Sequence, residues 1–98
     1  MNIKIYKYPL AIKDSQVITL PAGSTVLSIK NLHEVPVLYA AVNTECKAEG
    51  YINIECRGTG QPLNGKENTE IVETLLFNSG SLVLHFFTHR MPKKEMSE

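Results

Sequence analysis

The sequence predicts an all-β fold, a small antiparallel β-sandwich or partly open barrel of about seven strands. Short apolar segments recur along the chain, Gly, Pro and Asn separate them, and no long amphipathic helix is evident. The length of 98 residues and the hydrophobic fraction of 43% suit one domain with one modest core. We therefore expect a single β domain over residues 1–88 and a charged, flexible C-terminal tail over residues 89–98.

The first half of the chain predicts four strands, each bounded by turn-forming residues. Apolar and polar side chains alternate in the first segment, which Pro9 ends. Pro21 and Gly23 mark a turn between the second and third strands. Pro36 falls near the start of the fourth strand, where a missing N–H is tolerated. The four expected strands are residues 2–8, 15–20, 25–30 and 35–42.

The second half predicts three more strands, separated by a loop rich in Gly, Asn and Pro and by a turn at Asn78-Ser79-Gly80. The middle segment, Glu-Ile-Val-Glu-Thr-Leu-Leu, also fits two turns of helix, so its pattern leaves strand and helix open. The expected strands are residues 50–57, 70–77 and 81–88.

Charge and hydropathy exclude two classes of partner. Lys plus Arg and Asp plus Glu both number 10, so no basic field is available for polymeric nucleic acid. No apolar run approaches the ~20 residues that span a bilayer, and no leader peptide is evident. We expect a soluble intracellular protein with no membrane partner.

The two cysteines are expected to be reduced thiols. Cys46 falls near the tip of a predicted hairpin and Cys56 at the far end of its second strand, well beyond the Cα separation of about 7 Å that a disulfide allows. Cys56 is interpreted as a small core residue.

The segment Arg57-Gly58-Thr59-Gly60-Gln61, followed by a proline, is the most distinctive motif. Backbone amides of such a turn can cradle an anion, with Arg57 adding charge and Tyr39 or Tyr51 stacking on the base of a small nucleotide. The motif has neither a Gly-Lys-Ser/Thr sequence nor a following helix, so it matches no common phosphate loop. The alternative is a tight turn or bulge that redirects the chain.

Two predicted strands are apolar on both faces, residues 37–42 and 82–87. Antiparallel strands of a small monomer usually leave one face polar. We therefore expect a homo-oligomer whose interface includes Val83, His85 and Phe87. The alternative is that both are central strands of a sandwich, with Phe87 partly exposed.

Catalytic and metal-binding patterns are missing from the sequence. His85 and His89 lie about 13 Å apart if they share a strand, too far to ligate one ion. The chain has no Gly-x-Ser-x-Gly and a single aspartate, Asp14. We expect no enzyme activity, no metal and no cofactor.

Five stretches carry a resemblance to known proteins: the opening Ile-Tyr-Lys-Tyr, Val26-Leu27-Ser28-Ile29, residues 37–42, residues 57–62, and residues 80–87. Through these stretches, over roughly residues 1–88, the order of elements resembles a family of short, uncharacterised bacteriophage proteins. Gln61 stands where the resemblance leads us to expect His. The resemblance implies a phage protein acting in the host cytoplasm, and it brings no assigned activity.

These observations favour a non-enzymatic phage accessory protein. It would bind a host protein, or act structurally, through an apolar sheet face as a homo-oligomer. The alternative is a sponge with an anti-defence role, which sequesters a small nucleotide-like host signal at Arg57-Gly58-Thr59-Gly60.

Overall fold

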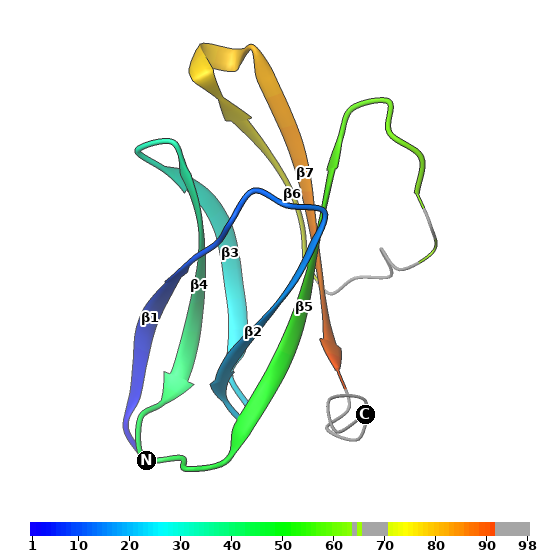
Figure 1. Ribbon diagram of the computed structural model, residues 1–98. Helices are drawn as coiled ribbons and strands as arrows, with labels where there is room; N and C mark the ends of the chain where they lie inside the picture. The colour runs from blue at the N-terminus through cyan, green and yellow to red at the C-terminus, as the bar shows by residue number, and fades with distance from the viewer. Residues whose placement is uncertain (64, 66–70, 92–98) are drawn as a thin grey trace.

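A computed structural model describes residues 1–63, 65 and 71–91. The described chain forms seven strands in two antiparallel sheets that pack face to face (Figure 1), which confirms the predicted β-sandwich. The elements are β1 (Ile3–Pro9), β2 (Ser15–Pro21), β3 (Thr25–Leu32), β4 (Val35–Asn43), β5 (Glu49–Gly58), β6 (Ile71–Phe77), a short 3-10 turn η1 (Asn78–Gly80) and β7 (Leu82–Met91).

The chain passes between the two sheets more than once. Sheet A has the strand order β1-β4-β3, and sheet B has the order β2-β5-β7-β6. The hairpins β3–β4 and β6–β7 keep consecutive strands together, whereas β1 and β2 enter different sheets. Each strand therefore presents one face to the core and the other away from it.

The core lies between the sheets and follows the two-residue period of the strands. Leu38 and Ala40 of β4 face Ile52 and Ile54 of β5 in one fully buried cluster. Phe86 of β7 is the largest fully buried side chain. The other members of the cluster are Leu10, Leu20, Val26, Ile29, Val42, Cys56, Leu75, Phe77 and Leu84.

The segment that was open between strand and helix is a strand. Leu75 of β6 lies opposite Leu84 of β7, and both side chains are buried in the core. An extended segment buries Leu75 and Phe77 on one face, since they are two residues apart.

Strand β7 extends three residues beyond the predicted end at Thr88. His89, Arg90 and Met91 continue the pairing with β5, opposite Asn53, Ile52 and Tyr51. The polar sequence of these residues gave no strand signal, because this end of β7 is fixed by its partner strand. The remainder of the predicted tail, residues 92–98, lies outside the described residues.

On β1 the side chains of Tyr6 and Tyr8, rather than those of Ile3 and Ile5, lie on the inward face. Tyr8 lies opposite Leu38, which points into the core, and packs against the hydrophobic cluster. Burial raises the pKa of Tyr8, and the neighbouring Tyr6 raises it further. Ile3 and Ile5 therefore point away from the core, and they are 54% and 66% exposed.

Two strained turns, the β3–β4 turn of sheet A and the β6–β7 turn of sheet B, are hydrogen-bonded to each other at one end of the sandwich. His33 and Glu34, in the β3–β4 turn, have φ angles of 52° and 71°, in the left-handed region. The Asn31 side chain accepts a 2.7 Å hydrogen bond from the Glu34 amide. The Glu34 carboxylate in turn accepts a 2.6 Å bond from the amide of Asn78 in the β6–β7 turn. The sandwich is thus closed along its β3–β6 side.

The two cysteines are expected to react very differently with Ellman's reagent. Cys56 is buried in the core, and burial raises the pKa of its thiol, so its reactive thiolate is scarce near neutral pH. Cys46 is half-buried and free. In native protein one thiol per chain should react quickly, and the second should react only in denaturant. Cys46→Ser should remove the fast phase, and a fast phase of two equivalents would contradict this assignment.

Candidate functional site

The outward face of sheet B gathers most of the predicted site residues. One end of this face brings together Arg57, His85, Phe87 and Val83. Tyr51 lies on the same face, farther along β5. They share this face because alternate residues of a strand point the same way. The outward residues are Ser15, Val17 and Thr19 of β2; Tyr51, Asn53, Glu55 and Arg57 of β5; Val83, His85, Phe87, His89 and Met91 of β7; and Val72, Thr74 and Leu76 of β6.

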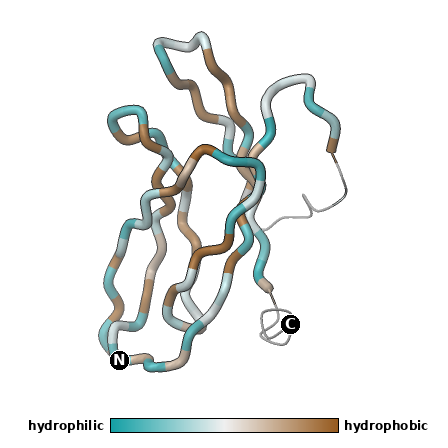
Figure 2. Tube along the Cα trace, in the orientation of Figure 1, coloured by the Kyte–Doolittle hydropathy of each residue, from teal (hydrophilic) through white to brown (hydrophobic). Residues whose placement is uncertain are grey.

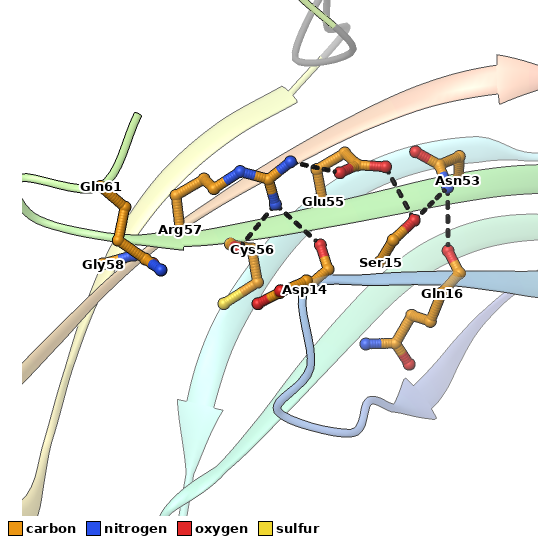
Figure 3. A network of polar contacts seen from close by, with 9 residues as sticks. All are labelled: Asp14, Ser15, Gln16, Asn53, Glu55, Cys56, Arg57, Gly58 and Gln61. Carbon is orange, nitrogen blue, oxygen red and sulfur yellow. Dashed lines mark hydrogen bonds and ion pairs between the residues drawn. The ribbon is translucent and has the colours of Figure 1, made fainter. Parts of the chain in front are cut away.

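Arg57 forms a buried ion pair with Glu55 on this face (Figure 3). Its Nη2 donates to Glu55 Oε1 at 2.8 Å, and the two side chains are only 9% and 3% exposed. Its Nη1 donates to the carbonyls of Asp14 and Cys56, both at 2.9 Å. The guanidinium therefore fastens the segment before β2 onto β5, and its charge is compensated within the chain.

The polar network continues from Glu55 towards β2. Ser15 Oγ donates to the second carboxylate oxygen, Glu55 Oε2, at 2.8 Å. Asn53 Nδ2 donates to Ser15 Oγ at 3.1 Å and to the Gln16 carbonyl at 3.4 Å. Both carboxylate oxygens thus have donors, which is what a buried charge requires. We call Ser15, Asn53, Glu55 and Arg57 the polar network.

His85 lies between two threonine hydroxyls. Its Nε2 is 2.7 Å from Thr59 Oγ1, and its Nδ1 is 2.9 Å from Thr74 Oγ1. A nucleophile activated by histidine usually has a third group, such as a carboxylate, to orient the ring. Here the uncharged hydroxyl of Thr74 occupies that position. We therefore give the two contacts of His85 a structural role, in which they tie the loop after β5 to β6 and β7.

Apolar side chains flank this histidine on both sides. Val83 lies opposite Leu76, and Phe87 lies opposite Val72, with the His85–Thr74 pair between them. Val72 and Leu76 are each 59% exposed. The tube in Figure 2 shows hydrophobic stretches along both strands of the β6–β7 hairpin. We call Val72, Leu76, Val83 and Phe87 the apolar patch.

Gly58 to Gln61 form a tight turn. The Gln61 amide donates to the Gly58 carbonyl at 3.1 Å, and Gly60 has a φ of 92°, which favours glycine at the third position. The Gln61 side-chain oxygen accepts a hydrogen bond from the Gly58 amide. One of the three amides expected to cradle an anion is therefore used within the turn.

The two candidate stacking tyrosines do not approach Arg57. Tyr51 is on the same face but six residues away along β5, about 20 Å at the rise of a strand. Tyr39 lies between the buried Leu38 and Ala40 of β4, so it points outward from sheet A on the opposite side of the sandwich. A pocket combining Arg57 with either tyrosine is not assembled within one described chain.

Glu55, Asn53 and Ser15 are the site residues that the sequence analysis missed. The contact of Glu55 with Arg57 could have been predicted, because two residues of opposite charge at i and i+2 on a strand share a face. Ser15 and Asn53 could not be found, because their contact depends on the pairing of β2 with β5.

Over residues 1–63, 65 and 71–91, no three His, Cys, Asp or Glu side chains gather as a metal site would require. Within the same ranges, no helix has the length and hydropathy needed to cross a bilayer.

The fold and this face define a small β-sandwich domain with a buried polar network beside an exposed apolar patch. The chain belongs to the family described as Domain of unknown function (DUF7352), which matches residues 1–97. No curated protein and no solved structure matches the chain.

Proposed function

We propose that this protein is a non-enzymatic binding module, acting as a homo-oligomer, which docks a partner protein on the apolar patch. The observation that carries the proposal is the exposure of Val72 and Leu76, each 59%, beside Phe87. Exposed apolar patches bordered by polar groups are characteristic of protein–protein contact sites. The His85–Thr74 pair supplies hydrogen-bonding capacity in the middle of the patch.

The biological setting that we propose rests on the resemblance to phage proteins. In that setting the chain is a phage accessory protein in the host cytoplasm, and its partner is a host protein. The balanced charge of 10 basic and 10 acidic residues accords with a partner recognised by apolar contacts rather than by a strong electrostatic field.

Sequestration of a small nucleotide at Arg57–Gly60 has less support. The Arg57 guanidinium pairs with Glu55, so an incoming phosphate would have to displace a buried carboxylate. The Gly58 amide already donates a hydrogen bond to the Gln61 side-chain oxygen, so it is not available to an anion. An anti-defence role by sequestration remains the competing proposal, and it predicts a stoichiometric small molecule in protein isolated from infected cells.

Replacing Phe87 with Asp is expected to abolish partner binding. Truncation of a central aromatic contact commonly costs about 2 kcal/mol or more, and a buried aspartate adds a desolvation penalty, so affinity should fall at least ~30-fold. Tagged wild-type protein and Phe87→Asp would be incubated with host lysate, and the retained proteins compared by quantitative mass spectrometry and then by calorimetry. Ile12→Asp, at a position 52% exposed in the β1–β2 connection, is the matched control and should bind normally. Equal retention by Phe87→Asp would refute the patch as the docking site.

A further inference from the structure

Strand β1 is an edge strand with an exposed apolar face. Among the described strands it pairs with β4 alone, at the outer side of sheet A (Figure 1). Ile3 and Ile5, which share its outward face, are 54% and 66% exposed. An uncovered edge of this kind is a ready site for another strand to add.

The hydrogen bonds at the two ends of β1 show which backbone groups face outward. Thr44 N donates to Asn2 O at 2.9 Å, and Leu10 N donates to Pro36 O at 2.8 Å. In an antiparallel pair, bonded residues alternate along each strand, so the even-numbered residues of β1 bond to β4. The N–H and C=O groups of Ile3, Ile5 and Lys7 therefore point away from sheet A.

From this geometry we infer that two copies of the chain pair through β1, antiparallel, about a twofold axis at Ile5. The inference deepens the proposed function by naming the contact that makes the homo-oligomer. Pairing joins two three-stranded sheets into one continuous sheet of six strands. The apolar patch belongs to sheet B, so it stays accessible to a partner protein.

Side-chain complementarity selects this register. With Ile5 opposite Ile5 of the second copy, Ile3 lies opposite Lys7 and Lys4 lies opposite Tyr6. Two isoleucines meet at the axis, each Lys4 ammonium lies beside an aromatic ring, and no like charges are directly opposed.

The two neighbouring registers are less favourable. Centring the axis on Lys4 places two ammonium groups opposite each other, which destabilises a strand pair. Centring it on Tyr6 places Pro9 opposite Ile3, and proline has no N–H to donate. Among these three registers, only the one centred on Ile5 opposes no pair of lysines and places Pro9 opposite no residue of β1.

Replacing Ile5 with Lys tests the pairing, because it sets two lysines against each other at the axis. Light scattering across the micromolar range should give twice the 10.9 kDa chain mass for wild type and the single chain mass for Ile5→Lys. Val35→Lys, on the same face of sheet A at the far end of β4 and 41% exposed, should remain a dimer. A monomeric wild type, or a dimeric Ile5→Lys, would overturn the inference.

Cross-linking checks the register independently of affinity. Directly bonded antiparallel residues have Cα atoms about 5.5 Å apart, within the range of a disulfide. In a Cys46→Ser background, Ile5→Cys should oxidise to a covalent dimer, and Ile12→Cys should not. Rapid dimerisation of both would show random collision and would contradict the register.

The two proposals fail in different ways. Ile5→Lys should lose dimerisation and keep the docking site for the partner, whereas Phe87→Asp should lose the partner and remain dimeric. If Phe87→Asp becomes monomeric and Ile5→Lys does not, the copies associate through sheet B, and the β1 pairing is wrong.

Discussion

Arg57→Ala is expected to lower the free energy of unfolding by about 3–5 kcal/mol. The substitution leaves the Glu55 carboxylate, whose side chain is 3% exposed, in the protein without its cation. Breaking a buried pair on one side costs this much because an uncompensated charge stays buried. The loss is a large fraction of the roughly 5–15 kcal/mol that stabilises a typical domain. Urea denaturation followed by circular dichroism measures it.

The double variant Glu55→Leu/Arg57→Met is the matched control. It removes both charges and keeps apolar volume, but it also removes the hydrogen bonds to the Cys56 carbonyl and from the Ser15 hydroxyl, so its loss of stability should be clearly smaller than that of Arg57→Ala rather than zero. A nearly neutral Arg57→Ala would contradict a structural role for the guanidinium. It would return Arg57 to consideration as a ligand-binding residue, and with it the sequestration proposal.

Phe86→Ala is expected to destabilise the fold by about 3–5 kcal/mol. Phe86 is fully buried between the sheets, opposite Cys56 on β5 and Glu73 on β6. Removing its ring loses transfer free energy and leaves a cavity that strands on both sides hold open.

Phe87→Ala is the control that separates the core from the outward face. Phe87 is the next residue, has the same side chain and is only partly buried, so its loss should be markedly smaller. The difference between the two variants, measured in the same urea titration, reports the orientation of β7. Equal losses, or a larger loss at Phe87, would mean that the strand register is wrong.

The positions of the strands could be predicted from local patterns, but their partners could not. Alternation and turn residues located the strands in the sequence, because a half-buried strand requires a two-residue period wherever it lies. The assignment of β1 to sheet A and β2 to sheet B depends on pairing with β4 and β5, far along the chain. For the same reason the sequence did not show that Tyr8, rather than Ile5, faces the core.

The candidate site was predictable in part. Val83, His85 and Phe87 could be placed on one face, because they are two residues apart on a strand. The partner of Arg57 could have been found by the same rule applied to Glu55. The contacts of His85 with Thr59 and Thr74 could not, because they join a loop and two strands that meet only in the folded chain.

In the phage setting that we propose, the docking function is tested by native mass spectrometry of the protein isolated from infected host cells. We expect a complex that contains copies of the 10.9 kDa chain together with a second protein, and we expect Phe87→Asp to lose that protein. Copies of the chain that carry a stoichiometric small molecule, released on denaturation and with no second protein, would contradict the docking function and favour sequestration.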